Sequence, residues 1–299
     1  MSNLNEHQGQ DSPRRDESVR ELEEVELQTK MERIGRKLLV LSGKGGVGKS
    51  TVATNLALTL AQAGKKVGLL DVDLHGPSIP TILGLTGQRL ATDSTGQIMP
   101  LPVGGNLSVV SIGFLLGDPT DAVIWRGPMK YKAIRQFLKD VNWGRLDYLV
   151  IDSPPGTGDE PLSVAQMVGK DAWAVIVTTP QKVAIADVRR SVSFSKSMNL
   201  HVAGIIENMS GLICPHCGER IDLFKTGGGV RLAAEMEVPF LGCIPIDPKI
   251  VDSADDGIPF VKSFADSESA RAFQKVVEPI LSQNVTRIES TDPLERLSK

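Results

Sequence analysis

The chain carries Leu38-Leu39-Val40-Leu41-Ser42-Gly43-Lys44-Gly45-Gly46-Val47-Gly48-Lys49-Ser50-Thr51, and this segment dictates its architecture. An apolar run typical of a β-strand ends at Ser42, a glycine-rich loop follows, and Lys49-Ser50 begins a helix. This is the spacing G-x-x-x-x-G-K-[ST] in its strand–loop–helix context. Glycines let the backbone curl until its N–H groups face phosphate oxygens, and the helix dipole favours the negative charge. The sequence therefore predicts a site for a nucleoside triphosphate.

Within this loop we assign Lys49 to the β- and γ-phosphates and Ser50 to Mg²⁺. A second lysine, Lys44, is not needed by a loop that binds through backbone donors; the alternative to a specific role is a solvated loop cation. The predicted phosphate contacts are Gly43, Lys44, Gly45, Gly46, Val47, Gly48, Lys49, Ser50 and Thr51. The loop resembles the deviant Walker A motif of the MinD/ParA ATPases, whose early lysine reaches the partner's nucleotide. The resemblance implies an ATP-linked homodimer in which Lys44 acts in catalysis.

A second apolar run, from Val67 to Leu70, ends in Asp71 and Asp73. Residues two apart in a strand share a face, and beside the phosphate loop that face turns toward the phosphates. We expect Asp71 to hold the shell of Mg²⁺ and Asp73 to orient or deprotonate the attacking water. A solvated turn at the strand end is the alternative.

A third apolar run, 146–151, delivers Asp152 to the end of a strand, followed by Ser153-Pro154-Pro155-Gly156. This is the Walker B arrangement, in which the carboxylate lies near Mg²⁺ through a water. We expect the Gly156 N–H to contact the γ-phosphate, in a turn that changes conformation on hydrolysis. The alternative is a strand cap.

Two later strand ends offer contacts for the base. An Asn amide both donates and accepts hydrogen bonds, so Asn208 suits an adenine edge. Pro245 and Asp247 follow the next apolar strand and are assigned to the same pocket. Each signal is weak alone, because Asn at a strand end is usually a turn residue.

The motif Cys214-Pro215-His216-Cys217-Gly218 places two thiols on one loop. They supply two of the four ligands that zinc or an iron–sulfur cluster requires, and a two-fold dimer would complete a four-cysteine site on its axis. A zinc knuckle and a redox dithiol stay open at this point. We interpret Cys243 as a small hydrophobic residue of the strand Phe240 to Ile246.

The composition of the chain limits the class of protein to which it can belong. The chain has 299 residues, 41% hydrophobic, a net charge of −3 and three cysteines. These values favour a globular protein of the reducing cytoplasm that binds neither nucleic acid nor a membrane. No apolar run approaches the roughly 20 residues of a membrane span, and residues 1–20 lack the apolar core of a secretory signal.

The apolar runs alternate with helical patterns, which predicts an α/β fold: a doubly wound, mostly parallel sheet flanked by helices. We divide the chain into a polar, partly disordered extension (1–35, with a short helix over 17–34), one ATPase domain (36–283) and a polar tail (284–299). The predicted strands span 37–42, 67–71, 107–111, 147–152, 172–178, 202–207 and 240–245. The predicted helices span 49–63, 128–139, 161–167, 184–198, 228–236, 248–256 and 267–283, with 84–106 irregular.

Taken together, these motifs resemble those of the Mrp/ApbC (Nbp-type) family of ATP-binding iron–sulfur cluster carriers, over about residues 36–283. The resemblance implies a MinD-like fold and a homodimer that holds a bridging [4Fe–4S] cluster through Cys214 and Cys217 and passes it to apo-proteins. Residues 1–35 lack the four-cysteine motif of one branch and are too short for the small N-terminal domain of many bacterial members, so no permanent second cluster is expected.

Three other function classes compete with this one. A positioning ATPase acting on membrane or DNA needs an amphipathic helix or a basic face, whereas the tail 286–293 is mixed in charge and contains a proline. An electron-transfer ATPase resembling the nitrogenase iron protein has its cluster cysteines far apart in sequence. A regulatory ATPase stapled by zinc remains compatible with the cysteine pair.

Overall fold

The computed structural model describes residues 25–74, 76–115, 127–214, 216–224 and 227–282. The polar stretch 1–16 and the tail 284–299 lie outside the described residues. Residues 25–32 are helical, so the helix ends two residues before its predicted end at residue 34, where the first strand begins instead. In the described part of the chain, the structure shows no helix long and apolar enough to cross a membrane.

Within the described residues, a central sheet of eight strands has the order β12-β9-β8-β1-β7-β2-β6-β5. All neighbours are parallel except β5, which runs antiparallel to β6. The strands are β1 (Ile34–Ser42), β2 (Val67–Asp71), β5 (Leu101–Pro102), β6 (Leu107–Ser111), β7 (Leu146–Asp152), β8 (Trp173–Thr178), β9 (His201–Glu207) and β12 (Phe240–Cys243). The chain order changes direction around β1, so ligand loops gather at its carboxyl end.

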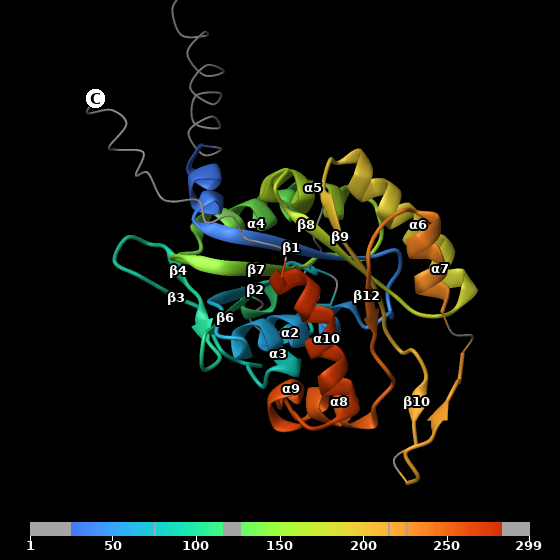
Figure 1. The fold of residues 1–299 in the computed structure, drawn as a ribbon. Helices are drawn as coiled ribbons and strands as arrows, with labels where there is room; N and C mark the ends of the chain where they lie inside the picture. The colour runs from blue at the N-terminus through green and yellow to red at the C-terminus, as the bar shows by residue number, and fades with distance from the viewer. Residues whose placement is uncertain (1–24, 75, 116–126, 215, 225–226, 283–299) are drawn as a thin grey trace, which may run out of the picture.

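Helices cover both faces of this sheet (Figure 1). One layer holds α4 (Gly127–Asp140), α5 (Asp159–Val168), α6 (Lys182–Ser197) and α7 (Gly228–Glu235). The other holds α2 (Lys49–Gln62), α3 (Ile79–Ile82), α8 (Pro248–Asp255), α9 (Phe260–Ser263) and α10 (Glu268–Ser282). The predicted doubly wound α/β fold is therefore confirmed.

Strand β1 shows why these elements form. Leu38 and Val40 pack into the core on the α2 side, whereas Leu39 and Leu41 pack into the core on the α4 and α5 side. All four side chains are at most 1% exposed. Because successive side chains of a strand point to opposite faces, a strand covered on both faces must be apolar throughout. This is why the continuous apolar runs predicted the strands correctly.

The structure differs from the prediction where elements are very short. The segment 84–106, predicted irregular, contains β3 (Ala91–Thr92), β4 (Ile98–Met99) and β5. A hairpin of β10 (Leu212–Ile213) and β11 (Arg220–Ile221) and the four-residue helices α3 and α9 were not predicted. Two-residue strands have no periodicity of their own and exist only through their partners. Strand β12 ends at Cys243 rather than at residue 245.

Gly64 terminates helix α2 in the way that the sequence predicts for a glycine just after a helix. Gly64 has φ 80° and its N–H donates to Ala61 O at 3.0 Å, just beyond the cap residue Ala63. A left-handed residue at this place satisfies carbonyls of the last turn, and glycine adopts that conformation without strain.

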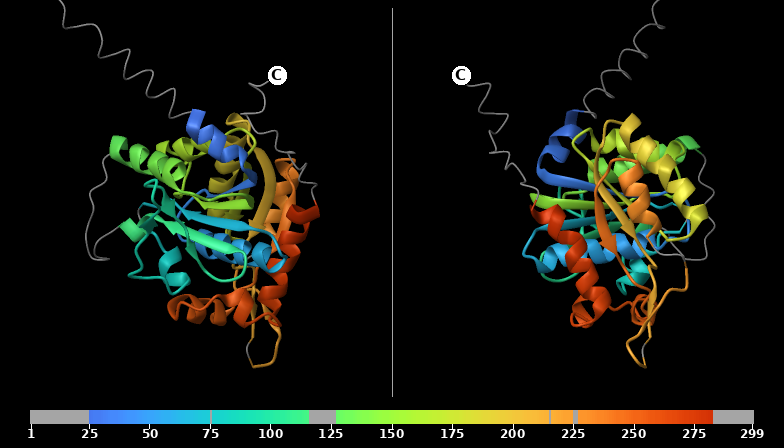
Figure 2. Two further views of the ribbon diagram at one scale, coloured as in Figure 1. Left: turned by 90° about the vertical axis from the view of Figure 1, so that its left-hand side faces the viewer. Right: turned by 45° about the vertical axis from the view of Figure 1, so that its right-hand side comes forward.

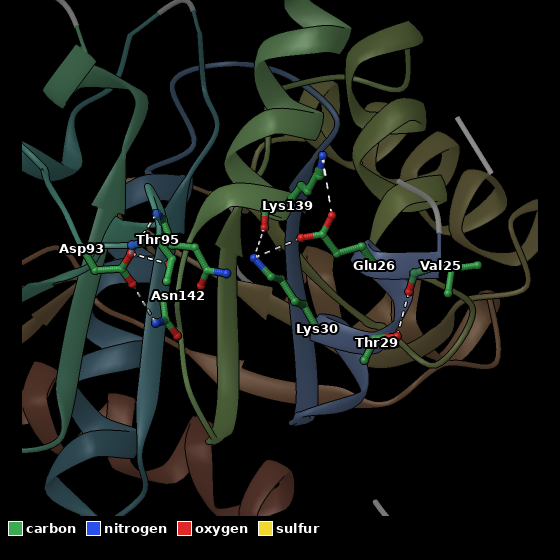
Figure 3. A network of polar contacts seen from close by, with 9 residues as sticks. Val25, Glu26, Thr29, Lys30, Asp93, Thr95, Lys139 and Asn142 are labelled. Carbon is green, nitrogen blue, oxygen red and sulfur yellow. Dashed lines mark hydrogen bonds and ion pairs between the residues drawn. The ribbon is translucent and has the colours of Figure 1, made fainter. Parts of the chain in front are cut away.

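Polar contacts attach the first helical segment to the α4 layer (Figure 3). Lys30 Nζ donates to the carbonyl of Lys139, and Glu26 lies 4.0 Å from Lys30 Nζ and 3.6 Å from Lys139 Nζ. Nearby, Asn142 Nδ2 donates to Asp93 Oδ2 at 3.3 Å, which ties the end of α4 to the β3–β4 turn. These contacts lie away from the phosphate loop and stabilise the frame that positions it.

Candidate functional site

A cavity of about 210 Å³ opens at the carboxyl end of β1, at the predicted phosphate-binding loop. It is lined by Ser42, Lys44, Gly45, Gly46, Gly48, Lys49, Ser50, Thr51, Asp73, Ser78 and Pro155. Gly43 and Val47, also predicted contacts, are not in this lining, and the Val47 side chain is buried at 2% exposure. The cavity is smaller than the roughly 300–1,000 Å³ of a site that encloses a drug-sized ligand, so it suits the phosphates rather than a whole nucleotide.

Two glycines of the loop are required by close packing. A Cβ on Gly43 would lie 2.4 Å from the backbone carbonyl carbon of Asp187 in α6. A Cβ on Gly48 would lie 2.4 Å from Asn208 Nδ2, and Gly48 has φ 77°. A Cβ on Gly45 or Gly46 would meet nothing within 4 Å. The loop is thus held tightly at both ends and is open where phosphates would lie.

The side chain of Lys49 points toward two carboxylates, those of Asp73 and Asp152. Its Nζ donates to Asp152 Oδ1 at 2.5 Å and lies 3.5 Å from Asp73 Oδ2. Lys49 is 6% exposed and Asp152 is fully buried. The structure therefore brings together Lys49, Asp73 and Asp152, which the sequence had assigned to one site from three separate motifs.

Asp71 lies beneath this cluster. The parallel pairing of β2 with β7 places it in register with Asp152, and it is fully buried. Ser111 Oγ donates to Asp71 Oδ2 at 2.9 Å, and the Asp73 N–H donates to Oδ1 at 3.1 Å. Burial raises the pKa of Asp71 to about 8, and the charge of Asp152 adds to the rise.

These residues fit the Mg²⁺ that the sequence predicts. Burial also raises the pKa of Asp152, while the charge of Lys49 and hydrogen bonds from Lys49 and Ser50 act to lower it. Asp71, Asp152 and Asp73 thus surround a single lysine, Lys49. When the carboxylates are ionised, their negative charge exceeds the charge of the lysine, and a divalent cation would offset the difference. Carboxylate and hydroxyl oxygens are the ligands that Mg²⁺ prefers.

Gly156 and Asn208 have partners within the protein. The Gly156 N–H donates to Ser42 O at 2.8 Å, in a turn where Gly156 has φ 92°. Asn208 Nδ2 donates to Val47 O at 2.9 Å and so supports the phosphate loop. The Gly156 N–H is thus bonded within the protein, whereas the Asn208 amide keeps a second N–H and its oxygen, and the predicted contacts of both residues with the nucleotide remain predictions.

Pro245 and Asp247 do not line the phosphate cavity. Pro245 lines a separate cavity of about 570 Å³ beside β12 and α10. Asp247 caps α8, and its Oδ1 accepts the Lys249 N–H at 3.0 Å. Their assignment to the base pocket remains a prediction.

Two residues that sequence reasoning left unassigned belong to this region. Ser111 ends β6 and holds Asp71, and Glu207 ends β9, fully buried. Glu207 accepts hydrogen bonds from Ser210 Oγ at 2.7 Å and from the Gly229 N–H at 2.6 Å. Both stand at the end of an apolar strand, the same signal that identified Asp71 and Asp152.

The cysteine pair lies at the tip of the β10–β11 hairpin, which projects beyond the rest of the domain (Figure 2). The Cys214 N–H donates to Glu219 O and the Gly218 N–H donates to Cys214 O, both at 2.9 Å. Hydrogen bonds from Cys217 and His216 lower the pKa of Cys214, and Cys217 is exposed. Among the described residues, no group of three or more His, Cys, Asp or Glu is placed to hold a metal.

Cys243 differs from its interpretation as a core residue. Because β12 ends there, its side chain is only partly buried and lines the 570 Å³ cavity. Its Sγ lies 3.9 Å from Glu207 Oε1. Burial raises the pKa of this thiol.

The thiols of Cys214 and Cys243 should therefore react with iodoacetamide at different rates. We expect Cys214 of the metal-free protein to be alkylated faster than Cys243 at neutral pH, because a lowered pKa leaves more thiolate. As pH rises, the Cys214 rate should reach its midpoint first. Peptide mass spectrometry at a series of pH values measures both rates, and an equal or lower midpoint for Cys243 contradicts the assignment.

Comparison with known proteins agrees with this geometry. The family model ParA: NUBPL iron-transfer P-loop NTPase matches residues 33–281. A cytosolic Fe-S cluster assembly factor NUBP2 homolog of Trichoplax adhaerens is 52% identical over 82% of this chain and 94% of its own length. An iron-sulfur cluster carrier protein of Methanocaldococcus jannaschii is 47% identical over 87% and 89%, respectively.

Solved structures show the same likeness. A nucleotide-binding protein of Archaeoglobus fulgidus in complex with ADP is 41% identical, with a TM-score of 0.71, over 79% of this chain and 92% of that one. The cell division ATPase MinD of Pyrococcus furiosus is 26% identical, with a TM-score of 0.59, over 83% and 98%. With a family model matched from β1 through α10, this chain belongs to the ParA/NUBPL iron-transfer P-loop NTPases.

Proposed function

We propose that this protein binds and hydrolyses ATP with Mg²⁺ and, as a homodimer, assembles a [4Fe–4S] cluster that it passes to apo-proteins. The observation that carries the proposal is that one domain presents both a phosphate cavity and a surface loop with two cysteines, of which Cys217 is exposed. The names of the relatives, an assembly factor and a cluster carrier, support the same role.

The chain's own residues have the following parts in hydrolysis. Backbone N–H groups of the loop and Lys49 bind the β- and γ-phosphates, and Ser50, Asp71 and Asp152 hold the metal shell. Bound Mg²⁺ would neutralise charge that develops on the phosphates. Asp73, which lines the cavity 3.5 Å from Lys49 Nζ, orients the attacking water.

The cluster is the cargo, and its ligands come from two chains. Cys214 and Cys217 supply two thiolates, and an iron–sulfur cluster takes four. A second copy related by a two-fold axis supplies the others. The exposed apolar residues Ile221 and Leu223, 44% and 52% exposed beside the cysteine loop, are available to meet that copy.

The compartment and partners follow from this role. Several relatives are named cytosolic assembly factors, so we place the protein in the cytoplasm, where its free thiols stay reduced. Its partners are a second copy and apo iron–sulfur proteins, with neither nucleic acid nor membrane required.

Purification without oxygen tests the proposal. We expect broad visible absorption, with iron and sulfide in the protein after reconstitution, because thiolates of the two chains bind a cluster. Metal analysis and the absorption spectrum are measured on the same sample. A colourless protein that retains stoichiometric zinc instead would indicate a zinc-stapled regulatory or positioning ATPase.

A Lys44→Ala variant tests the dimer. Lys44 lines the phosphate cavity, where Lys49 already provides a cation. We expect the variant to fold and to bind ATP as the parent does, but to lose ATP-dependent dimerisation and turnover. Sedimentation with a non-hydrolysable ATP analogue measures the first and phosphate release the second. If the variant dimerises and hydrolyses like the parent, Lys44 is only a loop cation.

A further inference from the structure

A short segment joins the phosphate loop to the cysteine hairpin. It consists of Glu207, Asn208, Met209, Ser210 and Gly211, and we call these five residues the connector. Strand β9 leads into it and β10, followed by Cys214, leads out of it. The cysteine hairpin therefore follows the connector without an intervening element.

The first half of the connector is pressed against the phosphate loop. Asn208 Nδ2 donates to Val47 O at 2.9 Å, and its backbone N–H donates to Thr178 O at 2.7 Å. A Cβ on Gly48 would lie 2.4 Å from Asn208 Nδ2 and 3.6 Å from Met209 Cε. A change in the loop between Val47 and Gly48 must therefore move Asn208 or break its hydrogen bond.

The second half of the connector holds the base of the hairpin. The Ser210 N–H donates to Ile244 O at 2.9 Å, and Ser210 Oγ donates to Glu207 Oε1 at 2.7 Å. Arg220 Nη2, in β11, donates to Ser210 O at 3.1 Å, and the Ile246 N–H donates to Gly211 O at 2.7 Å. Arg220 thus ties β11 to the connector, β10 follows the connector directly in the chain, and the bonds with Ile244 and Ile246 hold the connector to the segment after β12.

The connector's backbone is held in an uncommon conformation. Met209 has φ 55° and Gly211 has φ 78°, both in the left-handed region. A non-glycine residue keeps such a conformation only when its surroundings impose it. Here Glu207 and Ser210, 0% and 1% exposed, impose it by bonding across the turn. Loss of one of these bonds would let the turn relax into another arrangement.

The alternative route, through the turn after β7, ends at the phosphate loop. Gly156 bonds to Ser42, but among the described residues no hydrogen bond joins 153–159 to 207–221. The connector, in contrast, contacts both sites.

We infer that Glu207 and Ser210 are positioning residues that transmit the nucleotide state of the phosphate loop to the spacing and exposure of Cys214 and Cys217. This inference rests on the proposed function, because it assigns the two sites to one cycle. ATP would change the contact between Val47 and Asn208, the turn held by Glu207 and Ser210 would respond, and the hairpin would move as a unit. By linkage, a ligand at the cysteines changes ATP affinity by the same factor.

The test measures coupling rather than activity. Iodoacetamide alkylation of Cys214 and Cys217 in the metal-free protein is followed by mass spectrometry, with and without Mg²⁺ and a non-hydrolysable ATP analogue. We expect the analogue to change the parent rate by at least about fivefold, the lower end of typical coupling. In Ser210→Ala and Glu207→Gln the ratio of rates should stay within about twofold of one, although calorimetry shows that the analogue binds.

Two control variants separate coupling from stability. Ser195→Ala removes a buried hydroxyl of α6, which bonds Ser191 O at 2.9 Å, and should keep the parent's ratio. Ser210→Thr keeps a hydroxyl at this position, beside the 570 Å³ cavity, and should also keep the parent's ratio of alkylation rates. Sedimentation identifies samples in the same oligomeric state, and only these are compared.

The possible failures are distinguishable. If Ser210→Ala and Glu207→Gln bind the analogue and keep the parent's ratio, the connector does not carry the signal. An unchanged alkylation rate in the parent with analogue bound overturns the inference and leaves ATP binding intact. Failure of the parent to bind the analogue overturns the proposed function together with the inference.

Discussion

Replacement of Lys49 by alanine is expected to weaken ATP binding strongly and to destabilise the domain. A charge-assisted contact to phosphate contributes about 1.5–3 kcal/mol, which is roughly 10–150-fold in affinity. In the structure Lys49 also bonds the buried Asp152 and faces Asp73. Removal of one partner of a buried ion pair typically costs about 3–5 kcal/mol, because the other charge is left unpaired.

The loss of stability should depend on pH. The pKa of Asp71 is raised to about 8 and that of Asp152 is raised by burial, so protonation of both is favoured in the folded state. A group with a raised pKa stabilises the fold at low pH and loses that contribution as pH rises through the folded pKa. The Lys49→Ala variant should therefore be closest to the parent in acid and weakest above about pH 8.

A double variant separates the two effects of Lys49. Lys49→Ala with Asp152→Asn removes the cation and the carboxylate that it neutralises, so thermal stability should recover while ATP binding does not. Calorimetry with ATP and thermal unfolding measure the two properties. ATP affinity equal to the parent's in Lys49→Ala would overturn the assignment of the loop.

Loss of either hairpin cysteine is expected to prevent cluster assembly. The parent, reconstituted with iron and sulfide, should hold about one four-iron cluster per dimer, because each chain supplies two of four thiolates. Cys214→Ala or Cys217→Ala leaves the dimer two ligands, so each variant should retain no cluster. Iron and sulfide counting with gel filtration measures the stoichiometry.

Cys243→Ala is the matched control for these variants. Its thiol lies in the cavity beside β12 rather than on the hairpin tip, so the variant should bind a cluster as the parent does. Retention of one cluster per monomer, or dependence on Cys243, would show that the bridging site is wrong.

The fold was predictable from sequence because its strands are buried on both faces. In β1, Leu38 to Leu41 had to be apolar without interruption, and the buried carboxylates Asp71 and Asp152 could be found because each ends such a run. The short strands β3 and β4 and the β10–β11 hairpin could not be found, because each is defined by a partner rather than by its own pattern.

Side-chain direction at the strand ends was equally beyond a linear pattern. The bond from the Asn208 amide to the carbonyl of Val47 could not be predicted, and the assignment of Asn208 to the base remains a prediction. Cys243 was interpreted as a core residue because its neighbours are apolar, but β12 stops one residue before Ile244 and leaves the thiol at the rim of a cavity. Both outcomes depend on where a strand ends in space.

The ion pair of Lys49 with Asp152 affects which form of the nucleotide can bind. Because the ammonium group is already neutralised from within, an incoming triphosphate must exchange places with a carboxylate rather than fill a vacant positive site. The displaced carboxylate then needs another cation at once. Nucleotide without magnesium should therefore compete poorly for the site, and the domain should select the magnesium complex of the nucleotide.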